Sequence, residues 1–446
     1  MRRSRREQRR AAGLSRRDFI ALSAASGAGI LAGCATNPVS GRRQLMLMSE
    51  GEEVALDRKW APHQFSADYG ASQDGGLNAY VAGVGAAMAD FTHRPAMPYS
   101  FRVINTPVVN GYTMPAGSVA LGRGLILAMS DEAELAAVLG HEMGHVNARH
   151  AAERMSKNIL MMAMVSGVAA YVENEREGYG DLAAGLGAIG AGALLARYSR
   201  EDEREADALG MEYMTRAGHN PQGMVGLMDA FRGLEKERPG AVALLFATHP
   251  MSDERYRTAA QRVQTTYAAA AQRDLHRQRY MDRTAGLRAI SSAIEQMQKG
   301  EAALACGKCD EAGGHFDAAL RTAPDDYAAL LLMAKCRLAQ NRPGDALRYA
   351  EHASRVYPDE PQADHVVGIC KERLRRYDGA LQSFNRYEQR LPGNSRTLFF
   401  RARCLEGMGS RRAAAVEYQR YMAREPAGDL ADYAARRLAE WGYAKP

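Results

Sequence analysis

The chain has 446 residues, 46% of them hydrophobic and 25% charged, so it can bury a sizeable core and is long enough for two or more domains. Its formal net charge of +6 comes from residues 1–33, where eight arginines outnumber Glu7 and Asp18; the other residues carry 50 basic and 50 acidic side chains. A neutral remainder offers no electrostatic footprint for nucleic acid, which excludes that class of partner.

The N-terminus has the pattern of an export signal. Paired arginines at 16–17 precede Phe19, a short apolar run follows, and residues 31–34 read Leu-Ala-Gly-Cys. The apolar run is too short to span a bilayer. The arginine pair resembles a twin-arginine signal and the final box resembles a lipobox, so we expect residues 1–33 to be a signal peptide and Cys34 to be lipidated. The alternative is a soluble chain with a disordered basic arm.

Residues 34–49 are then expected to form a lipidated tether. Ala35 follows Cys34 where an aspartate would favour retention at the inner membrane, so we expect attachment to the outer membrane, facing the periplasm. Regular elements come next. The pattern predicts helices over Glu50–Tyr69 and Gly75–Ala89, and strands over Tyr99–Ile104 and Gly117–Ala128.

The segment 138–146 contains the motif His-Glu-x-x-His, which indicates a specific chemistry. On a helix capped by Ser130 or Asp131, His141 and His145 project from one face and can share one zinc ion. Glu142 stands beside them to take a proton from water that the zinc activates. The bland alternative is a pair of solvated histidines. A third histidine, His150, lies nine residues after His141; with no glycine to turn it back, we interpret it as structural.

Two apolar segments, 159–171 and 182–196, follow this helix. Each is shorter than the roughly 20 residues that a membrane span needs. We expect a buried or interfacial helical hairpin, with two true spans as the alternative.

A second helix, predicted after Ser199, supplies the carboxylates that the site still needs. Two histidines leave a catalytic zinc one protein ligand short. Glu203 and Asp207 fall on one helix face, beside an apolar stripe. We assign Glu203 as the third ligand and Asp207 as the acceptor that fixes a histidine tautomer. The alternative is a charged, solvated face, to which we assign Glu201 and Glu205.

The last third of the chain repeats with a period of 34 residues. The repeated positions are Pro324, Pro358, Pro392 and Pro426; Ala312, Ala346, Ala380 and Ala414; and Phe316, Ala350, Phe384 and Tyr418. This period and pattern resemble the tetratricopeptide repeat, in which a small residue lets two helices approach and a proline ends the second. We therefore expect four repeats and a capping helix within residues 293–446, after a connecting helix over 271–292.

Three of the cysteines follow the same 34-residue period. Cys336, Cys370 and Cys404 are 34 residues apart, which favours buried packing positions on successive repeats. Cys306 and Cys309 lie at the first repeat's turn, where a disulfide and free thiols both remain open and a redox or second metal role is the minor alternative.

The joined motifs resemble the gluzincin family of HtpX, BepA and CAAX prenyl endopeptidases. The resemblance covers roughly residues 35–265 and rests on the histidine motif, on Ser199-Arg200-x-x-Glu203-x-x-Ala206-Asp207, and on Asn110-Gly111-x-x-x-Pro115-x-Gly117. It implies that Thr248-His249-Pro250 and Arg255 form a downstream part of the site. His249 would then be either an inhibitory fourth ligand or, with Arg255, a stabiliser of the oxyanion.

These observations predict an α+β protein: a mostly helical zincin-type peptidase domain with a small sheet over residues 50–270, followed by an all-α repeat solenoid. We expect a zinc endopeptidase with one Zn²⁺ per chain, acting on unfolded or misassembled envelope polypeptides. The resemblance adds the outer-membrane barrel assembly machinery as a partner of the repeats. The main alternative is a chaperone or assembly scaffold whose zinc site is latent or structural; an integral-membrane peptidase is a further one.

Overall fold

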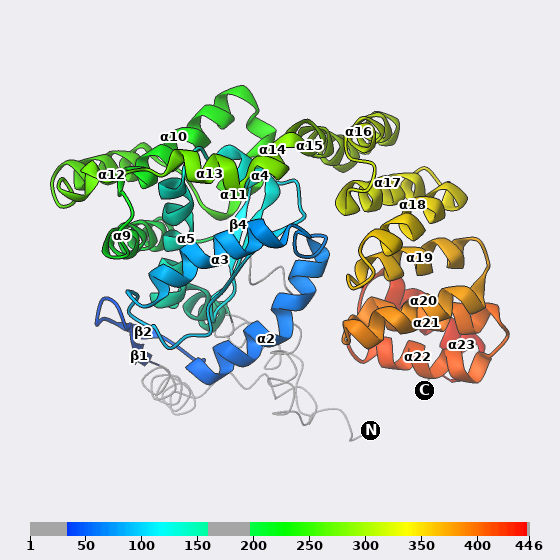
Figure 1. The fold of residues 1–446 in the computed structure, drawn as a ribbon. Helices are drawn as coiled ribbons and strands as arrows, with labels where there is room; N and C mark the ends of the chain where they lie inside the picture. Colours follow the sequence, from blue (N-terminus) through cyan, green and yellow to red (C-terminus); the bar gives the residue numbers. More distant parts are fainter. Residues whose placement is uncertain (1–33, 159–196, 444–446) are drawn as a thin grey trace, which may run out of the picture.

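The computed structural model describes residues 34–158 and 197–443. The part before residue 291, predicted to be a peptidase and called the peptidase part below, and a stack of helix pairs lie side by side, with the stack descending from α15 to α23 (Figure 1). The predicted signal peptide and the two apolar segments lie outside the described residues. None of the helices in the described ranges is long and apolar enough to cross a membrane.

The chain enters through a small antiparallel hairpin, which differs from the loose tether expected over residues 34–49. Strands β1 (Cys34–Thr36) and β2 (Arg43–Leu45) pair with Cys34 opposite Leu45. The Asn37 side chain closes the turn by accepting hydrogen bonds from two backbone N–H groups and donates one to the carbonyl of Ala148. The hairpin is therefore fastened to the end of the histidine-bearing helix, and lipidation of Cys34 stays a prediction.

Two helices and a three-stranded sheet come next, close to the predicted positions. The elements are α2 (Glu50–Ala67), α3 (Gly75–Ala89), β3 (Ser100–Ile104), β4 (Gly111–Thr113) and β5 (Ser118–Gly122). The sheet order is β3-β5-β4, with β3 parallel and β4 antiparallel to β5. Strand β4 is thus an edge strand, beside the helices that carry the site.

The strand predicted over Gly117–Ala128 is wrong in its second half, which forms the helix α4 (Arg123–Ala128). Two glycines explain the change. A Cβ on Gly124 would lie 2.1 Å from the carbonyl oxygen of Pro107, and one on Gly122 would lie 2.5 Å from that of Val108. The backbone passes close to this loop at two positions where a Cβ would not fit, which accompanies the change from strand to helix. The apolar run alone cannot distinguish a buried strand from a buried helix.

The remaining helices of the peptidase part surround this core. They are α5 (Glu132–Asn147), α9 (Arg200–Arg216), α10 (Gln222–Glu237), α11 (Ala243–Thr248) and α12 (Asp253–Gln264), with a 3-10 turn at Pro239–Ala241. The single connecting helix expected over 271–292 is wrong. The structure has a 3-10 turn at Ala270–Gln272 and the short helices α13 (Arg277–Arg283) and α14 (Ala285–Ala289), because His276 takes a left-handed conformation that starts a new helix.

The repeats form four helix pairs and a final helix. They are α15 (Ser291–Ala305) with α16 (Cys309–Thr322), α17 (Tyr327–Ala339) with α18 (Pro343–Val356), α19 (Gln362–Arg373) with α20 (Tyr377–Arg390), α21 (Ser395–Gly407) with α22 (Arg411–Met422), and α23 (Asp429–Glu440). The small and aromatic positions of the 34-residue period are fully buried. Gly300 and Gly368 face Phe316 and Phe384, whose rings fill the space of the missing Cβ.

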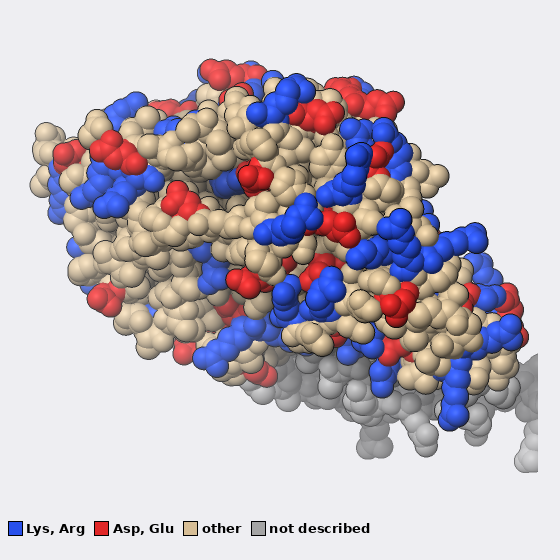
Figure 2. All heavy atoms as spheres, turned by 45° about the vertical axis from the view of Figure 1, so that its right-hand side comes forward, with Lys and Arg blue, Asp and Glu red and all other residues tan. Residues whose placement is uncertain are grey.

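The cysteines sit as the period suggests. Cys336, Cys370 and Cys404 are buried on the first helices of their pairs, and Cys306 and Cys309 are free thiols in this structure. On the face that includes the repeats, Lys and Arg alternate with Asp and Glu rather than forming a field of one sign (Figure 2).

Candidate metal centre

Helix α5 carries the His-Glu-x-x-His motif in the middle of the core. Asp131 caps it by accepting a hydrogen bond from the N–H of Glu134, and every residue of the helix is buried. Helix α9 packs against it at unusually close range. A Cβ on Gly144 would lie 2.8 Å from the Cα of Ala206, and one on Gly210 would lie 2.8 Å from the backbone N of His141. Small residues on both helices therefore bring the two sets of functional side chains together.

Helix α9 begins at a capping box formed by Ser199 and Asp202, which fixes where its first turn starts. Glu203 follows in that turn with no measurable exposure, and Asp207 comes one turn later, also buried. Both carboxylates point toward α5. Glu201, by contrast, is exposed, as its assignment to the solvated face suggested.

Four side chains converge on one point: His141 and His145 from α5, Glu203 from α9, and His249 from the loop after α11. All their donor atoms lie within 4.8 Å of one another, and several are closer, for instance 3.1 Å between the Nε2 atoms of His141 and His145 and 2.9 Å from His249 Nδ1 to Glu203 Oε1. Donor atoms that bind zinc in a tetrahedron are separated by about 3.4 Å. The four residues therefore fit a single ion.

The donor set also suits zinc chemically. Three imidazoles and one carboxylate match the nitrogen and oxygen ligands that zinc prefers, and all four side chains are buried, as a site that excludes bulk water requires. The His249 nitrogen occupies the corner that an open catalytic site would leave to water. The geometry is thus that of a closed, four-ligand site.

Glu142 lies beside this cluster and is not part of it. Its Oε1 is 3.9 Å from Nε2 of His249, and its Oε2 is buried without a hydrogen-bond partner among the described residues. Burial raises the pKa of Glu142 above its usual value. A carboxylate with a free oxygen and a raised pKa is suited to accept a proton and later to release it.

Asp207 and Arg255 hold the ligands in place. Asp207 Oδ1 is 3.0 Å from Nδ1 of His141, so the other ring nitrogen of that histidine faces the cluster. Arg255 contacts Asp207 through Nε and Nη2, each at 2.7 Å, and Glu203 through Nη1 at 2.6 Å. Burial would raise the pKa of Asp207, but the charge of Arg255 and its hydrogen bonds lower it.

The contacts of Arg255 are with side chains of α9 and with the backbone, and its role as a stabiliser of the oxyanion stays a prediction. Its Nη1 also donates to the carbonyl of Pro250, so its guanidinium is engaged by Asp207, Glu203 and this backbone oxygen. In this structure Arg255 positions the carboxylates of α9, and His249 lies between Glu142 and Glu203.

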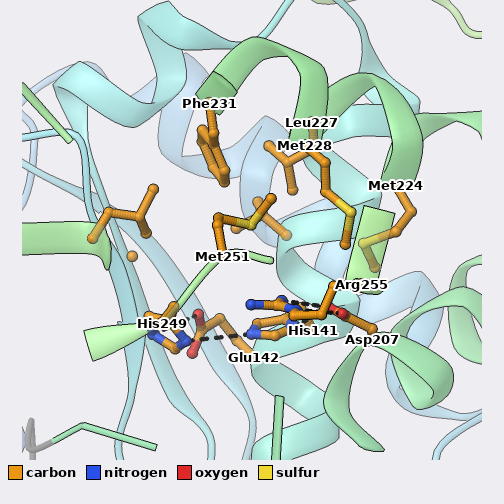
Figure 3. A pocket seen from close by; sticks show the side chains of 13 residues that line it. His141, Glu142, Asp207, Met224, Leu227, Met228, Phe231, His249, Met251 and Arg255 are labelled. Carbon is orange, nitrogen blue, oxygen red and sulfur yellow. Dashed lines mark hydrogen bonds and ion pairs between the residues drawn. The ribbon is translucent and has the colours of Figure 1, made fainter. Parts of the chain in front are cut away.

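An apolar pocket opens over the cluster (Figure 3). In the figure the side chains of α10 stand above His141, Glu142 and His249, with Met251 between them. The apolar side chains that line the pocket are Val138, Met224, Leu227, Met228, Phe231, Leu245 and Met251. Methionines adapt to varied shapes, so this wall can receive apolar groups of different outline.

Two aromatic neighbours of His145 escaped the sequence analysis. The ring of Tyr198 stacks on His145 with centroids 3.8 Å apart, and His150 approaches the Nδ1 atom of His145 to 2.9 Å. His150 was interpreted as structural, and it is not one of the four converging donors. Its return toward His145 needs a left-handed residue, and Arg149 supplies it with φ of 60° in place of a glycine.

Comparisons with known proteins agree with this geometry. A model described as "Peptidase family M48" matches residues 47–263, and a tetratricopeptide repeat model matches residues 303–368.

Three curated relatives share part of the chain. Metalloprotease YcaL of Escherichia coli (strain K12) is 28% identical, over 47% of this chain and 78% of its own. The beta-barrel assembly-enhancing protease of Yersinia pestis is 23% identical, over 82% of this chain and 81% of its own. The mitochondrial metalloendopeptidase OMA1 of Arabidopsis thaliana is 28% identical over 50% of this chain, which spans only 42% of that relative. With its His-Glu-x-x-His helix, its converging donors and its appended repeats, this chain belongs to peptidase family M48.

Proposed function

We propose that this protein is a zinc-dependent endopeptidase that hydrolyses peptide bonds in misfolded or unassembled envelope proteins. The observation that carries the proposal is the convergence of three imidazoles and one carboxylate, with Glu142 free beside them. Bound zinc would lower the pKa of water toward neutrality and polarise the scissile carbonyl. Glu142 would take the proton of the attacking water and pass it to the leaving amine.

His249 would keep the enzyme latent. Its Nδ1 atom stands 3.4 Å from Nε2 of His141 and 2.9 Å from Glu203, in the corner that water and substrate need. It is carried by a loop after the six-residue helix α11 and not by the α5–α9 pair, so it can leave without disturbing the other three donors. Activation would then be a movement of this loop.

The apolar pocket and the edge strand would receive the client. An extended polypeptide can add to the edge strand β4, and a large apolar side chain next to the scissile bond would enter the pocket below α10. Selection would depend on exposed apolar side chains and extended backbone, which unfolded proteins offer. The repeats would bind clients or an assembly machine.

The cellular setting is part of the proposal. The name of the Yersinia pestis relative refers to beta-barrel assembly, and the N-terminal pattern of this chain resembles a lipoprotein export signal. Together they support a lipid-anchored protein at the periplasmic side of the outer membrane, with the barrel assembly machinery as a partner of the repeats.

The filled fourth corner also favours a second candidate function. A site with four protein ligands and no open position is the usual form of a structural zinc site. The chain would then act as a chaperone or assembly scaffold through its repeats. The two candidates differ in whether removing His249 opens an active enzyme.

The test uses the full chain with an unfolded outer-membrane barrel protein as substrate. Zinc content and degradation are measured for wild type, Glu142→Gln and His249→Ala. The endopeptidase requires one zinc per wild-type chain, faster degradation by His249→Ala, and none by Glu142→Gln or by the double variant. If His249 instead stabilises the oxyanion, His249→Ala is slower than wild type. Zinc-loaded protein that never cleaves, even without His249, would leave the scaffold as the function.

A further inference from the structure

His145 has a chain of polar contacts on the side away from the metal cluster. Its Nδ1 atom lies 2.9 Å from Nδ1 of His150, and Nε2 of His150 lies 3.2 Å from Oε2 of Glu205. Asp202 is farther from that nitrogen, at 3.7 Å. His150 is buried, whereas the Glu205 side chain is 31% exposed, so the chain runs from the cluster toward the surface.

The backbone conformation at Arg149 brings His150 into this contact. Helix α5 ends at Asn147, and Arg149 takes the left-handed conformation that turns His150 back beside His145. Arg149 is held there by Glu53, at 3.0 Å, and by the carbonyl of Met48, at 2.7 Å. A bulky residue in the left-handed region costs free energy, and the buried ion pair with Glu53 offsets that cost.

With a metal ion bound at Nε2 of His145, one arrangement of ring hydrogens would be possible along this chain. His145 presents Nε2 to the other donor atoms, so a metal ion there would need its lone pair, and the ring hydrogen would sit on Nδ1. That hydrogen would be donated to Nδ1 of His150, which must then lack one. His150 would consequently carry its hydrogen on Nε2 and donate it to Glu205.

We propose that His150 and Glu205 are positioning residues, which hold His145 in the tautomer and ring orientation that a metal ion needs. The proposal rests on the metal site of the proposed function. It makes the two histidines of α5 a matched pair: Asp207 orients His141 by the same Nδ1 contact, at 3.0 Å. Tyr198 adds a stacked ring that stops His145 from rotating. Such outer partners typically change metal affinity by about 10–100-fold.

The test compares two substitutions of His150 in the full chain. His150→Asn keeps an acceptor near the position of Nδ1, whereas His150→Leu fills similar space without one. Zinc affinity is measured by competition with a chromophoric chelator. We expect about 10–100-fold weaker binding for His150→Leu and a loss of only a few fold for His150→Asn. Equal affinities for the two variants would overturn the proposal, because a purely structural residue is indifferent to the acceptor.

A matched pair on α9 tests the second member. Glu205→Ala is expected to weaken zinc binding several fold, while Glu212→Ala, which removes a partly exposed acid that forms an ion pair with Arg216 on the same helix, leaves it unchanged. Equal effects of the two substitutions on zinc affinity would show that Glu205 does not help to position His145.

Nitrogen NMR of the His145 ring in metal-free protein separates this proposal from the proposed function. Wild type should show more of the Nδ1–H tautomer than His150→Leu, whether or not the protein cleaves peptides, because Nδ1 of His150 can accept that hydrogen. Equal tautomer populations in the two proteins would overturn the positioning role. Zinc bound without peptidase activity would instead count against the proposed function alone.

Discussion

The metal centre and the junction between the peptidase part and the repeats both bury charge, and they do so differently. At the centre, Arg255 contacts Glu203 at 2.6 Å and Asp207 at 2.7 Å. At the junction, Glu301 and Lys335 meet only through the hydroxyl of Tyr69, at 3.3 and 3.4 Å, and Oε2 of Glu301 has no partner among the described residues. The centre is fixed in one geometry, while the junction buries a carboxylate oxygen that has no partner among the described residues, which costs free energy.

The junction also has firmer contacts, among them the buried hydrogen bond from Ser66 to Glu360. Arg123 at the start of α4 meets Asp326, the residue that caps α17, and both side chains are 5% exposed. Gln298 of α15 adds a hydrogen bond of 2.7 Å to the carbonyl of Pro107, in the loop before β4. The first two repeats are thus attached to the segments on either side of β4 and β5.

The largest expected effect comes from removing Arg255. Arg255→Ala leaves two buried carboxylates without their cation, and breaking a buried pair in this way costs about 3–5 kcal/mol of unfolding free energy. Chemical denaturation of the metal-free protein measures it. Zinc binding should weaken as well, since the orientation of Glu203 is lost. Arg204→Ala, an exposed arginine on α9, serves as the control. A change below 1 kcal/mol for Arg255→Ala would show that the centre is less tightly determined than its contacts indicate.

Asp326→Asn tests the junction in the same way, by removing one charge of a buried ion pair. The amide still caps α17, but the buried charge of Arg123 loses its partner, and we expect a loss of about 3 kcal/mol. Zinc affinity should stay at the wild-type value because α5 and α9 are untouched. Hydrogen exchange would report faster opening of α17 and its neighbours. Weakened zinc binding in this variant would contradict the separation of the two regions.

Gly144→Ala tests how far the site depends on the close approach of α5 and α9. The added methyl group would stand 2.8 Å from the backbone of Ala206, so the helices must move apart, at a cost of about 1–3 kcal/mol. Glu203 would move with α9, and zinc affinity should fall together with stability. Gly233→Ala on α10, where no atom lies within 4 Å of the new Cβ, should instead stabilise the chain by about 0.5–1 kcal/mol.

The sequence predicts local features of this molecule better than contacts between distant segments. The spacing of His141 and His145 placed two imidazoles on one face of α5, and the 34-residue period placed the helix pairs of the repeats. Both follow from the geometry of one helix or one repeated unit. The buried carboxylate face of α9 could also be predicted, because the apolar stripe next to Glu203 indicates which side of the helix is buried.

What could not be predicted depends on tertiary contacts. The left-handed conformation of Arg149 is stabilised by Glu53, almost one hundred residues away, so the sequence near His150 gives no sign of it. The helix α4 forms where the Pro107 loop leaves no room for a strand. The engagement of Arg255 by both carboxylates requires α9 and α12 to be placed first.

The smallest expected effect concerns the pH dependence of the junction. Burial raises the pKa of Glu301 to about 7 and lowers that of Lys335 to about 8. Between pH 4.5 and 7 the folded chain holds more protons at Glu301 than the unfolded chain does. Stability therefore falls as pH rises through this window. Glu301→Gln should flatten that fall by about 1 kcal/mol, allowing for solvent screening.

Thermal unfolding of zinc-loaded wild type and Glu301→Gln across pH 4.5–7 measures the difference between their pH slopes. The protonation of the metal ligands is common to the two proteins, so it cancels in that difference. Glu295→Gln, a more exposed acid on the same helix α15, should leave the slope unchanged. If Glu301→Gln keeps the wild-type slope, the buried carboxyl of Glu301 does not make stability depend on pH. The junction then carries its buried charge at no greater cost than the metal centre does. If the slope flattens as expected, the junction is the part of the fold that is least stable at neutral pH, where its two faces would separate first.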